Sequence, residues 1–252
     1  MQKTLLLCWV FLLSPRAGTE EIIGGHTARP HARPYMAFIR FLSGSSTMRC
    51  GGTLVQRDYV LTAAHCKGRA MNVILGAQNI SKKERYQQVI PVGKAIPHPD
   101  YDPNNLANDI MLLKLKRKAS LTKAVKPLSL PGLRSRLRPG QVCSVAGWGQ
   151  VEIGKPFPDE LQEVALKVQA DETCESLFGT RYSRATQICM GDPHQKRNGF
   201  KGDSGGPLVC LNEFQGIFSS AKKNGTPPGV FTKVLSFLPW IKRTMKNHLL
   251  GH

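Results

Sequence analysis

Short apolar segments separated by turn residues recur along the whole chain, and they constrain its fold more than any other feature. Each clear segment is rich in β-branched, aromatic or other large apolar residues, and Gly, Pro or Asn lies near the ends of most of them. The clearest examples are Tyr59–Thr62, Met71–Leu75, Ile110–Leu113, Val142–Ala146 and Gly229–Val234. Strands of this length and spacing are typical of an all-β sandwich or barrel. The content of 24 Gly and 17 Pro fits a turn-rich fold and argues against a coiled coil.

Only the C-terminus has a clear helical pattern. From Ser236, a candidate N-cap, apolar residues recur about every three to four positions; they are Phe237, Trp240, Ile241, Met245 and Leu249. A chain of 252 residues is long enough for one large domain or two small ones. Pro139-Gly140, which follows the basic run 134–138, is the best candidate linker between two halves.

The N-terminus predicts a secretory signal over residues 1–19. Lys3 precedes the apolar run Leu5–Leu13, and small residues follow it. The alternatives are a membrane anchor and a buried helix. A membrane anchor needs about 20 apolar residues, and this run has nine. Nothing later resembles a membrane-spanning segment, so we expect none. Cleavage after Thr19 would leave Glu20-Glu21 in front of Ile22.

Secretion makes the cysteines candidates for disulfide bonds. Cys8 lies in the signal, and six others remain: Cys50, Cys66, Cys143, Cys174, Cys189 and Cys210. Six cysteines allow 15 pairings, and the sequence alone selects none of them. No pair has the C-x2-C spacing of a zinc site, so we expect no metal.

The net charge of +18 predicts polyanionic partners, namely nucleic acid, an anionic membrane or a sulfated glycan. Charges within residues 1–21 cancel, so the mature chain keeps the full value. The basic residues cluster at Lys114/Lys116/Arg117/Lys118, Arg134/Arg136/Arg138, Lys222/Lys223 and Lys242/Arg243/Lys246. No zinc finger or interleaving of aromatic with basic residues indicates nucleic acid. For a secreted protein we expect a sulfated, heparin-like glycan.

Three separate segments together predict nucleophilic catalysis. Ser204 lies in the glycine-rich segment Gly202-Asp203-Ser204-Gly205-Gly206-Pro207. A Ser among glycines can sit on a tight turn with its hydroxyl exposed, and nearby backbone N–H groups can converge on an oxyanion. His65 follows the apolar strand 59–62, and Asp109 precedes another. Each motif alone is weak evidence, since a lone His is usually structural and an Asp before a strand is usually a turn residue. In the order His, Asp, Ser they supply a base, an orienting acid and a nucleophile.

These segments, together with Ile22-Ile23-Gly24-Gly25, resemble the trypsin/chymotrypsin-like serine proteases in order across residues 22–246. Pro97–Tyr101, Cys143–Gln150 and Phe200-Lys201 are similar to the granzyme, chymase and cathepsin G group, and 240–246 to granzymes B and H. The resemblance implies an all-β fold of two six-stranded antiparallel barrels, about 22–131 and 132–252, with a C-terminal helix. It also implies the bridges Cys50–Cys66, Cys143–Cys210 and Cys174–Cys189.

The resemblance assigns roles to individual residues. Ser204 attacks the scissile carbonyl, His65 transfers the proton and Asp109 orients His65. The N–H groups of Gly202 and Ser204 form the oxyanion hole, and Ser219 supports Asp109.

Activation is also implied by the resemblance. Buried Asp203 needs a cation, and the new α-amino group of Ile22 supplies it once Glu20-Glu21 is removed. No Arg or Lys precedes Ile22, so the implied activator is a dipeptidyl peptidase. The alternative is that Glu20-Glu21 simply ends the signal.

The implied specificity pocket is neutral. Asn198 occupies the floor, where trypsin-like members have Asp, and Gly229 lies where granzyme B has Arg. A neutral pocket favours cleavage after Phe, Tyr, Leu or Met. Ser219-Ser220-Ala221 forms the wall, and the extra methyl of Ala221 supports an elastase-like alternative with a preference for Leu, Met or Val. Lys201, beside the oxyanion turn, favours acidic residues after the cleaved bond.

The remaining expectations concern modification, partners and location. Asn79-Ile80-Ser81 and Asn224-Gly225-Thr226 are glycosylation sequons. Ala77 and Lys82-Lys83 replace calcium-binding carboxylates of trypsins, so we expect neither calcium nor a cofactor. The resemblance implies a secreted enzyme of cytolytic granules, with protein substrates, serpin-type inhibitors and sulfated proteoglycan as partners. The alternative is a non-catalytic, polyanion-binding family member, against which the intact triad counts.

Overall fold

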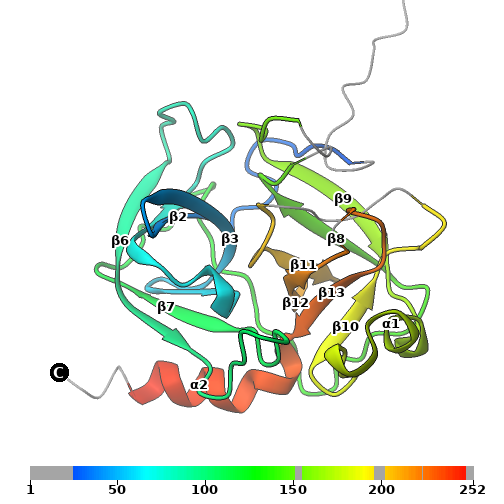
Figure 1. The fold of residues 1–252 in the computed structure, drawn as a ribbon. Coiled ribbons are helices and arrows are strands. Elements are labelled where there is room, and N and C mark those ends of the chain that lie inside the picture. Colours follow the sequence, from blue (N-terminus) through cyan, green and yellow to red (C-terminus); the bar gives the residue numbers. More distant parts are fainter. Residues whose placement is uncertain (1–24, 151–154, 196–201, 223, 248–252) are drawn as a thin grey trace, which may run out of the picture.

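The structure, a computed structural model, describes residues 25–150, 155–195, 202–222 and 224–247. Two β units lie side by side, and helix α2 lies along one end of the pair (Figure 1). The first unit is a closed antiparallel barrel in the order β2-β3-β4-β7-β6-β5. Its strands are β2 (Met36–Ser43), β3 (Ser46–Gln56), β4 (Tyr59–Thr62), β5 (Arg69–Leu75), β6 (Gln88–Pro97) and β7 (Met111–Leu115).

The second unit is an antiparallel sheet of seven strands in the order β1-β9-β8-β11-β12-β13-β10. Its strands are β1 (His26–Thr27), β8 (Val142–Gly147), β9 (Gln162–Lys167), β10 (Gln187–Met190), β11 (Pro207–Cys210), β12 (Glu213–Ser220) and β13 (Gly229–Lys233). The predicted all-β class is confirmed, and the five segments read as strands coincide with β4, β5, β7, β8 and β13 within a few residues.

Strand β1 belongs to the second sheet although it comes first in the chain. His26 pairs with Glu163, and the N–H of Ala28 donates to the carbonyl of Leu161 over 2.8 Å. The division expected near residue 131 does not anticipate this crossing. The N-terminal segment is therefore anchored on the unit that also carries Ser204.

Two α-helices and three short 3-10 turns complete the described secondary structure. They are η1 (Ala64–Cys66), α1 (Asp171–Phe178), η2 (Gly179–Arg181), η3 (Val234–Phe237) and α2 (Leu238–Asn247). Helix α2 confirms the helical pattern at the C-terminus. Ser236 is not its N-cap, because Ser236 lies in η3 and its Oγ donates to the carbonyl of Ala185. The sequence pattern does not predict α1, whose only buried residue is Cys174.

The core joins the two units. Aromatic residues of the second unit, Trp148 and Phe214, belong to the same buried cluster as the barrel residues. Phe38 of β2 meets Trp148 edge-on, with ring centroids 5.6 Å apart. Trp240 and Ile241 of α2 pack on this cluster too. The apolar face of α2 therefore covers one end of the core, and its basic residues remain exposed.

Three disulfides link the six cysteines of the described chain in the pairing that the resemblance implied. The Cα–Cα distances are 6.2 Å for Cys50–Cys66, 4.5 Å for Cys143–Cys210 and 5.8 Å for Cys174–Cys189. All three lie in the usual range for a disulfide. Within the residues that the structure describes, no helix has the length and apolar character needed to cross a membrane.

Candidate active site

Asp109 is the buried centre of a hydrogen-bond network between the two units. Its side chain is fully buried, and its carboxylate accepts three hydrogen bonds. The backbone N–H of His65 donates to Oδ1 over 3.0 Å, and His65 Nδ1 lies 2.7 Å from Oδ2. Ser219 Oγ donates to Oδ2 over 2.6 Å. A buried carboxylate requires such donors, and here they fix the ring orientation of His65.

The local chain explains how Asp109 comes to point inward. Asn108, immediately before it, has φ of 55° and donates through Nδ2 to the carbonyl of Asp100. Asn tolerates this left-handed conformation better than most residues. Thr232 Oγ1 then donates to the carbonyl of Asp109 over 2.9 Å. Asp109 is therefore held by both its backbone and its side chain.

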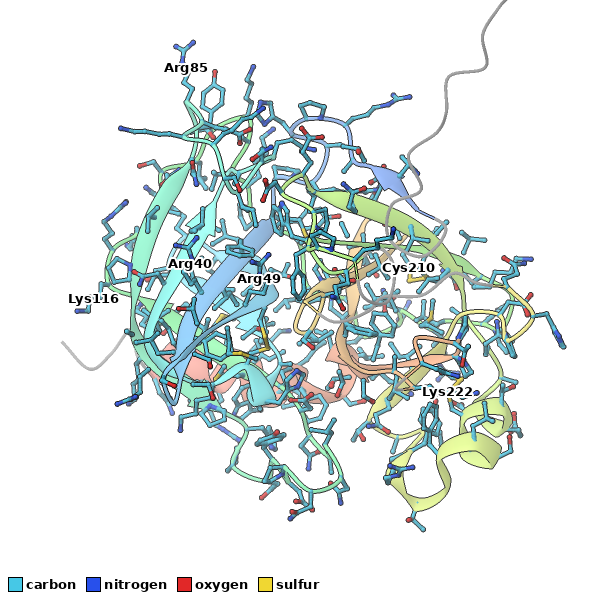
Figure 2. The ribbon with its side chains drawn as sticks, turned by 45° about the horizontal axis from the view of Figure 1, so that its top comes forward. Arg40, Arg49, Arg85, Lys116, Cys210 and Lys222 are labelled. Atoms are coloured by element: carbon cyan, nitrogen blue, oxygen red, sulfur yellow. A yellow bond between two sulfur atoms is a disulfide. The ribbon has the colours of Figure 1, made fainter. Side chains whose placement is uncertain are left out.

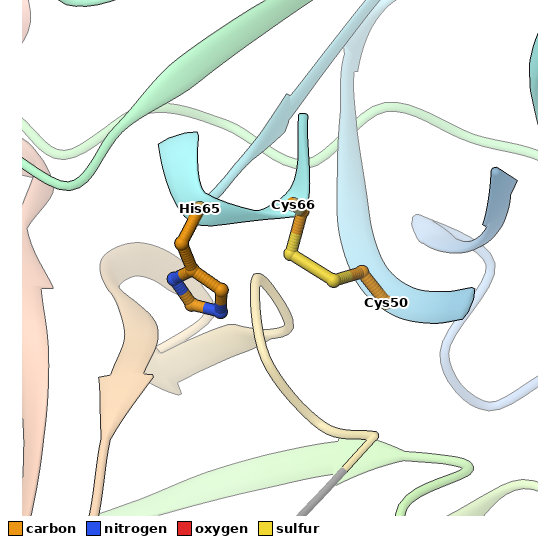
Figure 3. Close-up of side chains that lie close together, drawn as sticks. All are labelled: Cys50, His65 and Cys66. Carbon is orange, nitrogen blue, oxygen red and sulfur yellow. A yellow bond between two sulfur atoms is a disulfide. The ribbon is translucent and has the colours of Figure 1, made fainter. Parts of the chain in front are cut away.

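His65 lies in η1, directly after the buried strand β4. The next residue, Cys66, is bonded to Cys50 of β3, as Figure 3 shows. This bridge closes a loop of about 15 residues, which is worth about 3 kcal/mol in the chain-entropy model. About a quarter of the His65 side chain remains exposed (26%), whereas Asp109 is shielded. The imidazole of His65 is thus hydrogen-bonded to Asp109 through Nδ1, and part of the ring remains accessible to solvent.

The glycine-rich turn brings Ser204 next to this bridge. The N–H of Gly51, beside Cys50, donates to the carbonyl of Ser204 over 2.8 Å, and Cys66 Sγ lies 3.7 Å from the same oxygen. Gly205 has φ of 80°, and a Cβ there would lie 2.1 Å from Thr62 Oγ1. Glycine is therefore required at this position for both its backbone angle and its lack of a side chain.

Asp203 lies fully buried beneath the turn, against two glycines of the second unit. The N–H of Gly149 donates to Asp203 Oδ1 over 2.8 Å. A Cβ on Gly147 would lie 2.1 Å from Oδ1, and one on Gly149 would lie 2.4 Å from Oδ2. These glycines make room for the carboxylate. Motif analysis did not single them out, although both lie in the segment Cys143–Gln150.

An aromatic residue, Phe157, borders the turn beside Gly202. Gly202 has φ of 97°, and the Phe157 ring lies where a side chain on Gly202 would extend. The guanidinium of Arg49, one residue before Cys50, lies 4.4 Å from the centroid of the Phe157 ring. Arg49 and Phe157 thus form one wall beside Gly202, and no sequence motif indicated this pairing.

The structure describes only part of the predicted specificity pocket. Ser219 and Ser220 end β12, Ala221 packs against the core of the second sheet, and Gly229 begins β13 opposite Met190. Ser219, Ser220 and Gly229 therefore lie on the adjacent strands β12 and β13, and Ala221 directly follows β12. Asn198, Lys201 and Ile22 lie outside the described residues, as do the predicted signal and Glu20-Glu21.

Tyr101 is a titratable residue near the site that the sequence analysis did not single out. Burial, together with the negative charges of Asp109 and Asp102, raises the pKa of Tyr101 to about 12. Tyr101 therefore stays neutral beside the buried carboxylate over the physiological pH range. The only sequence signal was its position in the segment Pro97–Tyr101.

One group of side chains near the site has metal-ligand chemistry. Atoms of Cys50, His65 and Cys66 lie within 4.8 Å of one another. The two sulfurs are bonded to each other (Figure 3), so they are not available as thiolate ligands. In the loop that contains Ala77 and Lys82-Lys83, the Glu84 carboxylate accepts from the backbone N–H groups of Gln78 and Asn79.

The two sequons differ in exposure. Asn79 is only 8% exposed and its Oδ1 accepts from the N–H of Ser81. Asn224 is exposed, and its Oδ1 accepts from both the N–H and the hydroxyl of Thr226. Asn224 lies on the loop between β12 and β13, which carries the predicted pocket wall.

Comparison with known proteins agrees with this geometry. The family model described as Trypsin matches residues 22–241. Granzyme H of Homo sapiens is 62% identical over 247 residues, covering 98% of this chain and 100% of that protein. Duodenase-1 of Bos taurus is 54% identical, covering 97% of each. A solved structure described as "Structure of GrC" has a TM-score of 0.87 and 56% identity, and the match covers 89% of this chain and 100% of that one. The chain therefore belongs to the trypsin family of serine proteases and is granzyme-like within it.

Proposed function

We propose that the mature protein is a secreted granule serine endopeptidase that cleaves peptide bonds through an acyl-enzyme. The observation that carries this proposal is the bonded series Ser219–Asp109–His65 beside the turn that holds Ser204. In this arrangement Nδ1 of His65 is committed to Asp109, which leaves Nε2 to accept the Ser204 proton.

The acylation step follows from these positions. Ser204 Oγ forms a bond to the scissile carbonyl carbon, and His65 takes the hydroxyl proton. The resulting oxyanion is stabilised by the N–H groups of Gly202 and Ser204, each worth about 3–4 kcal/mol. His65 then donates its proton to the leaving amine, and water releases the acyl group by the reverse sequence.

Activation is proposed to depend on the buried Asp203. A carboxylate without exposed surface requires a compensating cation, and the α-amino group of Ile22 supplies it once a dipeptidyl peptidase removes Glu20-Glu21. Support comes from β1, which fixes the N-terminal segment on the same sheet as the Ser204 turn. Pairing at Asp203 would then order the oxyanion donors.

The proposed specificity is for large hydrophobic residues before the cleaved bond. Asn198 and Gly229 leave the pocket without a formal charge, and Lys201 favours acidic residues after the bond. The elastase-like preference for Leu, Met or Val remains the alternative because Ala221 narrows the entrance.

Storage on a sulfated proteoglycan is proposed from the charge distribution. Basic side chains project from both units; Figure 2 labels Arg40, Arg85 and Lys116 on the first and Lys222 on the second. Lys242, Arg243 and Lys246 lie on the exposed face of α2. We expect heparin retention that decreases steeply with salt, because surface charges are screened.

A fluorophosphonate probe tests the catalytic proposal. Protein with a free Ile22 should be labelled, Ser204→Ala should not, and Ser176→Ala, on the exposed side of α1, should label as the wild type does. Absence of labelling in the wild type would favour the non-catalytic, polyanion-binding alternative. A peptide library on the same protein tests the pocket, and strong cleavage after Lys or Asp would contradict it.

A further inference from the structure

Three strongly exposed apolar side chains lie on segments of the second unit that the fold ties together, and we call them the leucine edge: Leu133, Val142 and Leu211. Leu211 and Leu133 are 85% and 81% exposed, the highest values among the large apolar residues described. Val142 is 57% exposed. They come from three separate segments, so their proximity depends on the fold.

The strand register places two of them side by side. Leu208 pairs with Val145 and Val209 with Ser144, so continuing the ladder brings Leu211 opposite Val142. The bridge between Cys143 and Cys210 fixes this register; Figure 2 labels Cys210.

The segment that carries Leu133 is tied to the same hairpin. Ser135 Oγ donates to Glu213 Oε2 over 2.7 Å, and the N–H of Phe214 donates to the carbonyl of Ser129 over 3.1 Å. Leu133 lies between these two attachment points in the chain. The edge is therefore built from linked segments rather than from independent loops.

Leu211 is held in an unfavourable backbone conformation. The β11–β12 turn consists of Leu211 and Asn212, with φ of 52° and 62°. Such a turn prefers Asn, Asp or Gly, and leucine rarely adopts this conformation. Since the side chain is exposed, packing in the core does not account for a leucine here. Strain at an exposed apolar residue points to an external partner.

Cations surround the leucine edge. Arg134, Arg136 and Arg138 are exposed on the segment that follows Leu133, and Lys167, also exposed, is the strand partner of Val142. The nearby acid Glu213 accepts hydrogen bonds from Ser135 and Gln215. Exposed apolar side chains surrounded by basic residues are complementary to an anionic bilayer. Leucine side chains insert into the headgroup region, and arginine side chains bind lipid phosphates. A sulfated glycan would use the arginines but not the leucines.

We propose that the leucine edge docks the mature protein on anionic phospholipid bilayers. Strand β11 starts three residues after Ser204 and ends one residue before Leu211. Docking through this end leaves the nucleophile beyond the other end of the four-residue strand, which is about 13 Å long at roughly 3.3 Å per residue. The catalytic turn is thereby left free for proteins at the same membrane surface.

Vesicle sedimentation tests the proposal. The probes are vesicles of phosphatidylcholine alone and of phosphatidylcholine with phosphatidylserine, and the mature chain should bind only the second kind. The double variant Leu133→Ser/Leu211→Ser should bind at least about tenfold more weakly, because two apolar side chains no longer insert. The matched control Leu121→Ser/Leu177→Ser changes leucines that are 51% and 43% exposed elsewhere and should bind like the wild type.

Three further measurements test the proposal against a sulfated glycan and a second copy of the chain as the partner. Heparin retention of the leucine-edge variant should equal that of the wild type, since all cations remain. Tryptophan emission of a Leu133→Trp variant should shift to shorter wavelength on anionic vesicles. Equal vesicle binding by wild type and leucine-edge variant would overturn the proposal, as would an unshifted emission from the Leu133→Trp variant. A dimer in sedimentation velocity that disappears in the leucine-edge variant would instead assign the edge to a second copy and would also overturn it.

Discussion

Gly149→Ala provides a direct test of how Asp203 supports the catalytic turn. A Cβ at this position would lie 2.4 Å from the carboxylate carbon and from Oδ2, and 2.5 Å from Oδ1. Ordinary contact begins at 3.4 Å, so the carboxylate would have to move by about 1 Å. The hydrogen bond from the Gly149 N–H to Oδ1 would be distorted as well.

The expected result is a large kinetic defect in a folded protein. Asp203 is followed directly by Ser204 and preceded by Gly202, so its displacement should misplace the N–H groups of both proposed oxyanion donors. A 1 Å misplacement costs about 10²-fold, and the loss of one donor costs about 10²–10³-fold. We therefore expect kcat to fall by about 10²–10³-fold, which is about 3–4 kcal/mol of transition-state stabilisation.

The assay combines peptide hydrolysis with thermal unfolding. Gly140→Ala is the matched control: φ is 86° and nothing lies within 4 Å of its Cβ, so it should cost about 1 kcal/mol of stability and leave kcat unchanged. The reasoning is refuted if folded Gly149→Ala protein retains the kcat of the wild type.

Three further predictions follow from the site and its surroundings. Ser219→Ala removes one of the hydrogen bonds to buried Asp109 and should lower the free energy of unfolding in urea by about 1.5–3 kcal/mol, together with a lower kcat; an unchanged urea midpoint would contradict this. Tyr101 keeps its proton in the folded state up to a pKa of about 12, whereas unfolded tyrosine ionises near about 10. Its contribution to stability is therefore complete below about pH 10 and is lost between there and about pH 12, and Tyr101→Phe should show a smaller loss of stability over that range. For glycosylation, Asn224→Gln should remove a glycan detectable by endoglycosidase shift, and Asn79→Gln should produce no shift because Asn79 is buried.

The strands and the triad were predictable for different reasons. Strand β4 and its neighbours contain short runs of apolar residues, so the local sequence pattern was sufficient to predict these strands. His65, Asp109 and Ser204 lie in short motifs whose joint order is specific. Three hydrogen bonds join Asp109 to His65 and Ser219, and the catalytic roles of the triad stay a prediction.

Other features depend on long-range placement and left no local signal. Helix α1 buries little more than Cys174, so it has no apolar stripe to recognise. The pairing of β1 with β9 joins residues more than 130 positions apart, and two residues are too few to show a period. The leucine edge follows from the β8–β11 register; in the sequence, Leu211 is only one more apolar residue near a cysteine.

Because the hydrogen-bond network around Asp109 crosses between the two units, catalytic activity also depends on how closely the two units pack. Asp109 and His65 come from the first unit, whereas Ser219 and Thr232, which hold Asp109, come from the second, as does Ser204. A small separation of the units would break the short bonds between them while every strand kept its own ladder. Activity should therefore disappear before secondary structure does, so that in a heated or denaturant-treated sample far-ultraviolet dichroism overestimates the fraction of working enzyme.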